Sequence, residues 1–113
     1  MPAWSIIKTN NGDNGFCIVD GAFPSTCWRR SLPLSQCGTI CGRASNCVGF
    51  AYASNSGSCH LYATDTTCPN GFEHQPRSTT AATKDDLVAN ANSAWICYGK
   101  NSRKGTLTLE QYI

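Results

Sequence analysis

The chain has 113 residues, a formal net charge of +2 and only 14% charged side chains. This length predicts a single domain, and a core of this size alone leaves a thin margin of stability. The weak charge and the lack of any long apolar stretch argue against a nucleic-acid partner and against a transmembrane segment.

The first part of the chain predicts two strands and a loop. Residues 4–9 carry β-branched and aromatic side chains and stop at a cluster of turn formers at 10–15, which predicts a strand and a turn. Residues 16–19 form a short apolar run that predicts a second strand, buried on both faces. Residues 24–32 show no clean period, so we expect an irregular loop there.

The middle of the chain carries the clearest helix pattern. Cys37, Ile40 and Cys41 recur at the spacing of one helix face, and Ser35 stands where it can cap the amide groups of the first turn. No other segment shows this period as clearly. The helix should therefore begin near Ser35 and end between residues 43 and 46.

The next segment predicts a hairpin followed by a long loop. Residues 47–53 have strand composition, residues 54–57 are turn formers, and residues 58–62 form a second strand. Residues 64–83 are dominated by Thr, Ser, Pro, Asn and Gly. We expect this second stretch to be a long surface loop.

The last part of the chain predicts a brief helix and a final strand. Residues 83–91 suggest a short helix with Thr83 as its cap and Asp86 in an acidic first turn. Residues 94–98 predict a strand. Residues 99–113 are compatible with an edge strand, a linker or a tail, and the sequence does not choose among them.

Eight cysteines are the strongest compositional signal. They are Cys17, Cys27, Cys37, Cys41, Cys47, Cys59, Cys68 and Cys97. An even number at this density predicts disulfides, which persist in secreted, luminal or cell-surface settings. A metal site is disfavoured because no Cys-x-x-Cys pair occurs. We expect no metal and no cofactor, and a secreted or extracellular protein whose leader is absent from this sequence.

The spacing of cysteines and aromatic residues between 37 and 61 resembles a known family. The run is Cys37-x3-Cys41-x5-Cys47-x2-Phe50-x-Tyr52, followed by Gly57-x-Cys59-x-Leu61. It is similar to the signature of PAN/apple domains, and residues 16–17 and 95–100 resemble the first and last strands of such domains. The resemblance implies an α+β fold with a short antiparallel sheet packed on one central helix and stapled by disulfides. Residues 1–100 would form this domain, and residues 101–113 a tail or linker.

The resemblance also implies a disulfide pattern, which spacing alone cannot supply. Carried over by position, the family pattern pairs Cys37 with Cys59, Cys41 with Cys47, and Cys17 with Cys97. Cys27 and Cys68 remain and most simply pair with each other. This fourth bond departs from the usual two or three. Residues 62–94 form a longer connection than the family leads us to expect, and we expect the extra bond to pin it.

PAN/apple domains are recognition modules that bind proteins or, in some members, sugars such as galactose. The resemblance therefore implies a binding module and not an enzyme. Catalysis finds no support in the residues either, because paired cysteines leave no thiol nucleophile and no serine elbow is present. Trp28, Arg29 and Arg30 are the first candidates for a site, since an indole beside two guanidinium groups can stack on a sugar or hold a carboxylate or sulfate. The alternative is that Trp28 caps the core while the arginines are solvated.

Other candidate binding residues lie further along the chain. We expect Tyr52, His60 and Tyr62 to line one face of the hairpin, with simple packing as the alternative. His74 belongs to the expected loop, where recognition residues concentrate. Lys100 begins a small basic cluster that can meet a sulfated glycan, with solvation as the alternative.

Three functions are compatible with these features. The first is a module for adhesion that recognises a carbohydrate or glycoprotein through its surface loops. The second is a protein–protein interaction module of a larger secreted or cell-surface protein. The third is a secreted effector that resembles an inhibitor and uses residues 64–83 as its wedge. The partner is thus a glycan or an extracellular protein, and the oligomeric state is left open.

Overall fold

The computed structural model describes residues 4–65 and 67–101 of the protein. Its elements in chain order are β1 (Trp4–Ile7), β2 (Cys17–Ile18), β3 (Thr26–Arg29), α1 (Leu34–Arg43), β4 (Cys47–Ala53), β5 (Ser58–Ala63), β6 (Glu73–Gln75), the 3-10 turn η1 (Lys84–Asp86), β7 (Val88–Ala89) and β8 (Ile96–Lys100). The tail expected at 101–113 lies outside the described residues, except for Asn101.

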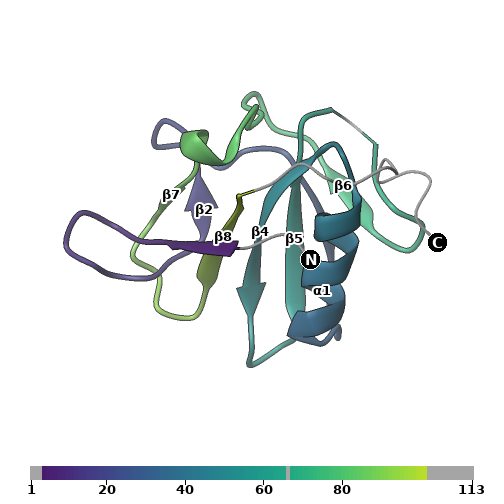
Figure 1. Ribbon diagram of the computed structural model, residues 1–113, viewed down its shortest axis with the longest axis horizontal. Coiled ribbons are helices and arrows are strands. Elements are labelled where there is room, and N and C mark those ends of the chain that lie inside the picture. The colour runs from purple at the N-terminus through teal and green to yellow at the C-terminus, as the bar shows by residue number, and fades with distance from the viewer. Residues whose placement is uncertain (1–3, 66, 102–113) are drawn as a thin grey trace.

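Two antiparallel sheets and one helix make up the fold. The large sheet has the order β1-β8-β4-β5-β3-β6, and β2 pairs with β7 in a small second sheet. Figure 1 shows α1 on one side of the large sheet, with β2 and β7 on the other side. The expected α+β fold, with one helix packed on an antiparallel sheet, is confirmed.

The helix side of the sheet holds the first apolar cluster. Cys37, Ile40 and Cys41 are buried as their spacing predicts, and they pack against residues such as Phe50 and Leu61 of the hairpin. Two further aromatic rings, from Trp4 and Tyr98, lie 4.9 and 4.7 Å from the ring of Phe50. Burial of this face supplies most of the driving force for docking the helix, because a helix this short is marginal by itself.

The two ends of α1 differ from the sequence-based expectation. Ser35 does not cap the helix: Pro33 occupies the cap position and makes no capping hydrogen bond through its side chain. The helix ends at Arg43, within the predicted range. Its last carbonyl groups receive hydrogen bonds from Lys100, whose Nζ donates to the carbonyl oxygens of Cys41 at 3.0 Å and Ala44 at 2.6 Å. A cation at this end of a helix is favourable.

The opposite side of the sheet holds a second cluster. Phe16, Cys17, Val48, Tyr62, Leu87 and Cys97 are among its buried residues. The hydroxyl of the fully buried Tyr62 donates to the carbonyl oxygen of Cys17 at 2.9 Å. Burial raises the pKa of this hydroxyl well above its ordinary value. The large sheet is thus covered on both faces.

Four disulfides fasten these layers together. They join Cys17 to Cys97, Cys27 to Cys68, Cys37 to Cys59, and Cys41 to Cys47. Three of these pairs are those that the resemblance implies, and the fourth, Cys27 with Cys68, joins the two remaining cysteines as expected. Two of the bonds tie α1 to the β4–β5 hairpin or its entry, one ties the small sheet to β8, and one ties the connection after β5 to β3.

Two segments predicted as loops contain strands. Residues 24–32 were expected to be irregular, but β3 lies inside the large sheet between β5 and β6. Residues 64–83 were expected to be a surface loop, yet they supply β6 as an edge strand. Both strands depend on partners that are distant in the sequence, so local composition does not reveal them.

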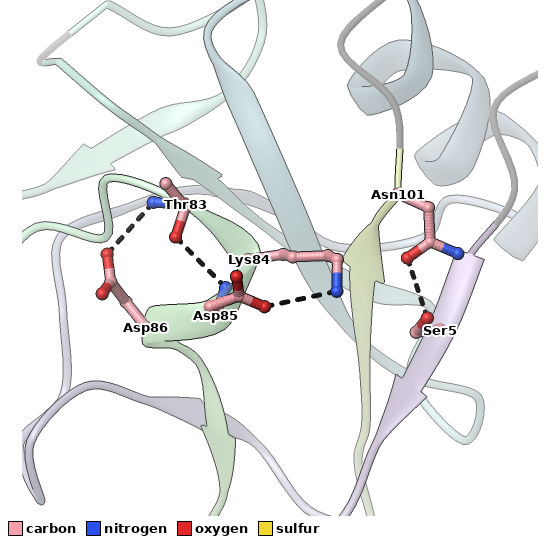
Figure 2. Close-up of polar contacts among 6 residues, drawn as sticks. All are labelled: Ser5, Thr83, Lys84, Asp85, Asp86 and Asn101. Atoms are coloured by element: carbon pink, nitrogen blue, oxygen red, sulfur yellow. Dashed lines mark hydrogen bonds and ion pairs between the residues drawn. The ribbon is translucent and has the colours of Figure 1, made fainter.

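The brief helix expected at 83–91 shortens to the single turn η1, followed by β7. Thr83 does cap it. The Thr83 hydroxyl accepts a hydrogen bond from the N–H of Asp85, and the Asp86 carboxylate accepts one from the N–H of Thr83 (Figure 2). The turn ends because the next residues pair with β2. Figure 2 also shows the Ser5 hydroxyl bound to Asn101, beside the edge of the sheet formed by β1.

Candidate binding site

An open pocket of about 290 Å³ lies on the side of the large sheet that faces away from α1. The register of β3 with its neighbours explains this position: Thr26 pairs with Gln75 of β6, and Trp28 pairs with His60 of β5, so these side chains share one face. The pocket lining combines aromatic and polar side chains. They are Phe16, Phe23, Pro24, Thr26, His60, Gln75, Arg77, Asn90, Asn92 and Trp95.

Phe16 is the centre of the aromatic wall. Its ring lies 4.8 Å from Trp95, 5.1 Å from His60 and 5.6 Å from Phe23, in each case edge to face. Edge-to-face pairs of this kind hold rings in fixed positions. Phe16 is buried, whereas Phe23 has 54% of its surface exposed. An apolar ring is therefore presented to solvent at the pocket by a rigid support.

The exposure of Phe23 follows from a tight turn. Val19 and Ala22 exchange backbone hydrogen bonds of 2.9 and 3.0 Å around Asp20 and Gly21. Both turn residues have positive φ, 51° and 77°, as the Asp-Gly pair favours in two-residue hairpin turns. The chain reverses here and places Phe23 directly after the turn.

Asn90 and Asn92 form part of the polar wall. The Asn90 Oδ1 accepts hydrogen bonds from the N–H of Phe16 at 2.9 Å and of Asn92 at 3.1 Å, and the Asn92 Oδ1 accepts one from the N–H of Ala94 at 3.1 Å. Because a backbone N–H can only donate, these contacts fix the orientation of both amides. The side-chain nitrogen of each amide remains as a donor.

Two backbone features hold Asn90 at the pocket. A Cβ at Gly15 would lie 2.4 Å from the backbone nitrogen of Ala91 and 2.8 Å from the Asn90 Oδ1, so only glycine fits this close approach. Ala91 adopts the left-handed conformation with φ of 67°, which costs a non-glycine residue about 1–2 kcal/mol. Strain of this kind is concentrated at functional sites.

Arg77 supplies the positive charge of the pocket. Its backbone is anchored twice to Ser25, because the Arg77 N–H donates to the Ser25 Oγ at 2.7 Å and this hydroxyl donates to the Arg77 carbonyl oxygen at 3.1 Å. The side chain is exposed. Within residues 4–65 and 67–101, the Arg77 guanidinium makes no ion pair. Its charge is thus available to a ligand.

His60 forms the floor beside the aromatic wall. Its Nδ1 lies 3.2 Å from the Thr26 hydroxyl, and its ring stacks on Trp28 at 5.8 Å. Burial lowers the pKa of His60 from 6.5 to about 4, because an imidazolium would be poorly solvated there. His60 is therefore neutral at physiological pH and acts as a polar aromatic surface.

The PAN domain family profile matches residues 30–93, more than half of the chain. The chain belongs to the PAN domain family. Domains of this family are binding modules for proteins or carbohydrates and are generally not enzymes. Neither the curated proteins nor the solved structures contain a significant match to this chain. In the part that the structure describes, no helix of this PAN domain is long and apolar enough to cross a membrane.

Of the candidate residues Trp28, Arg29 and Arg30, the first and the last lie next to the pocket but do not line it. Trp28 is partly buried, stacks on His60, and carries the Arg30 guanidinium over its ring at 5.7 Å. Arg29 alternates with Trp28 along β3 and is exposed beside Gly71, toward the helix side of the sheet. Trp28 therefore lies next to the pocket through its contact with His60, Arg30 lies on Trp28, and Arg29 lies apart from both.

The prediction that Tyr52, His60 and Tyr62 line one face of the hairpin is wrong in part. Tyr52 pairs with Cys59 and so faces α1, where its hydroxyl donates to the carbonyl oxygen of Leu32. Tyr62 lies on the pocket side but is fully buried. Of the three aromatic candidates on the hairpin, His60 alone lines the pocket of this PAN domain.

The last two candidate binding residues, His74 and Lys100, lie outside the pocket. His74 is exposed on β6, opposite Cys27, and is not part of the pocket lining. Lys100 does not belong to a surface basic cluster as expected: it is only 4% exposed and its ammonium group binds the end of α1. Its ammonium group therefore serves the fold and not a surface ligand site.

Most of the pocket was missed by sequence reasoning. The predicted strand at 16–19, buried on both faces, places Phe16 in the core, and no sequence pattern marks Phe23, Asn90 or Trp95 as binding residues. The available signals were local: the Asp-Gly turn that precedes Phe23 and the Asn-x-Asn segment before Trp95. Neither signal shows that the two segments meet.

Proposed function

We propose that this PAN domain is an extracellular module that binds carbohydrate in the pocket beside Phe23 and Trp95. The observation that carries the proposal is the exposed aromatic ring next to polar side chains held in fixed orientations. A sugar ring presents C–H groups on its faces and hydroxyl groups at its rim. Aromatic surfaces suit the faces, and amide and guanidinium groups suit the rim.

The cysteine content supports an extracellular setting. All eight cysteines are paired, and such bonds are typical of oxidising compartments. The pairing leaves no thiol nucleophile among the described residues. We take residues 1–100 as the binding module and residues 101–113 as a tail or linker, so that the protein acts by recognition and not by catalysis.

A protein partner is the second candidate, and a separate observation favours it. Arg30 lies over the ring of Trp28 at the end of β3, and Trp and Arg are the residue types most enriched at interaction hot spots. This pair adjoins the pocket through His60. A partner protein that engages Trp28 and Arg30 would make this chain a protein–protein interaction module of a larger secreted or cell-surface protein.

A glycan array probed with the oxidised protein tests the proposal. The informative variant is Phe23→Ser, because Phe23 is exposed and its loss should leave the fold intact. Leu34→Ser is the matched control, since Leu34 is also an exposed apolar residue, at 42%, but lies on α1. Selective binding that falls with Phe23→Ser and survives Leu34→Ser supports the proposal. If no glycan is retained, or if both variants bind equally well, the pocket is not a sugar site.

A parallel experiment tests the protein partner. Extracellular matrix proteins immobilised on a sensor surface would be probed with the wild type, with Phe23→Ser and with Trp28→Ala. If the Trp28→Ala variant loses binding to a matrix protein and the Phe23→Ser variant keeps it, the result favours a protein ligand at the end of β3. Retention that neither variant alters would exclude both surfaces.

A further inference from the structure

Most polar groups of the lining offer hydrogen-bond donors to a ligand, and Gln75 adds an amide that can both donate and accept. The side-chain oxygens of Asn90 and Asn92 are occupied by backbone N–H groups, as described above, so both amides present nitrogen. Arg77 can only donate. The Thr26 hydroxyl is engaged with His60. A ligand rich in acceptor oxygens satisfies this arrangement better than one rich in donors.

The charge of the pocket also favours a ligand with acceptor oxygens, and in particular an anion. Among the residues that the structure describes, Arg77 is the one charged side chain of the lining, and no carboxylate lines the pocket. Glu73, two residues before Gln75 on β6, pairs with Trp28 and stands outside the lining. His60 is neutral at physiological pH because burial lowers its pKa. The pocket therefore presents one positive charge, and this charge forms no ion pair within the described residues.

We propose that the pocket selects an acidic sugar unit, whose carboxylate or sulfate binds Arg77 while the sugar ring lies against Phe23 and Trp95. This inference rests on the proposed carbohydrate site and adds the class of sugar. Guanidinium matches a planar or branched anion with two parallel hydrogen bonds. The two hydrogen bonds between the Arg77 backbone and Ser25 place Arg77 beside Pro24 and Thr26, which also line the pocket.

The size of the pocket sets the length of the ligand. Its volume of about 290 Å³ lies just below the range of small-molecule sites, roughly 300–1,000 Å³. This space suits a single ring with its substituents. The bound unit is thus one acidic residue, such as a terminal residue or one side group of a larger glycan.

The test compares three sugars that differ at one carbon atom: galactose, galacturonate and galactose 6-sulfate. Calorimetric titration of the oxidised full chain should show that at least one of the two anions binds about tenfold or more tightly than galactose, as expected for a hydrogen bond to a charged group. Arg77→Gln should remove that difference. Arg77→Lys keeps the charge without the paired donors and should retain only part of it.

Arg43→Gln is the matched control, because it removes the same charge from an exposed residue on α1. The inference holds if the preference for an acidic sugar disappears in Arg77→Gln and persists in Arg43→Gln. Equal binding of galactose and both anions would overturn it while leaving the carbohydrate site in place. A preference that survives Arg77→Gln would also overturn it. If none of the sugars binds and the glycan array is silent, the proposed function fails as well.

Discussion

Acidification should destabilise this protein through His60, which is largely buried between Thr26, Trp28 and Phe16. The pKa of His60 is 6.5 in the unfolded chain and about 4 in the folded protein, because burial disfavours the imidazolium. Between these values the unfolded state binds more protons than the folded state. Stability therefore falls as the pH drops from 6.5 toward 4 and is retained above that range.

The size of this effect follows from the two pKa values. Between about pH 7 and pH 5 the loss in free energy of unfolding should reach at most about 2 kcal/mol, and it should approach about 3 kcal/mol near pH 4. Asp65 and Asp86 also titrate on acidification, but their pKa values lie below 3.8, so their contribution falls outside the upper part of this range. For Asp86 the cause is the pair of backbone hydrogen bonds from Thr83 and Ala82.

Urea unfolding of the oxidised protein at a series of pH values measures this effect. His60→Gln should remove the slope between about pH 6.5 and pH 5. His74→Gln is the matched control, because His74 is the other histidine of the chain and is exposed on β6. A wild-type protein with constant stability across this range, or a slope that disappears with His74→Gln, would refute the burial of His60 described above.

Three further predictions concern stability, each measured by urea or thermal unfolding. Gly38→Ala should stabilise the protein by about 0.5–1 kcal/mol, because the added Cβ would meet Phe50 at an ordinary 3.6 Å inside a helix; a loss would show that this contact is too tight. Lys100→Met should cost about 2 kcal/mol through its lost bonds to the end of α1, and an unchanged midpoint would contradict that role. Replacing Cys17 and Cys97 together by Ala should cost about 4 kcal/mol, since their bond closes a loop with a sequence separation of 80; a loss below 1 kcal/mol would argue against this contribution.

The locally encoded parts of the fold were predictable from the sequence. The helix period of Cys37, Ile40 and Cys41 and the turn formers at 54–57 act over a few residues, and both α1 and the β4–β5 hairpin match their predictions. The capping residue was not predictable from its type alone. Ser35 has the right side chain, but Pro33 takes the cap position and starts the helix one residue before Ser35.

The register of the hairpin explains the error on its aromatic face. The four-residue turn makes Ala53 pair with Ser58, so Tyr52 pairs with Cys59 and lies on the helix side with it. His60 pairs with Ala51 and lies on the other side. Counting back from the turn would have separated Tyr52 from His60, because paired residues share a face.

The pocket could not be assembled from the sequence because its residues come from segments far apart in the chain. Phe16 precedes β2, Phe23 follows a turn, Arg77 follows β6, and Trp95 precedes β8. The pairing of β2 with β7 and of β3 with β6 brings them together. Neither pairing has a local pattern, since β2 and β7 have two residues each and β6 has three.

The most direct test of the sugar site is an NMR titration of the oxidised, nitrogen-labelled protein with galactose and galacturonate. The site predicts saturable shifts of the Asn90 and Asn92 side-chain amide signals and of the Trp95 indole N–H, because these three residues line the pocket. The indole signal of Trp4, which packs on Phe50 on the helix side, should stay in place. Shifts confined to the helix side, or no shift at saturating sugar, would contradict a carbohydrate site in this pocket.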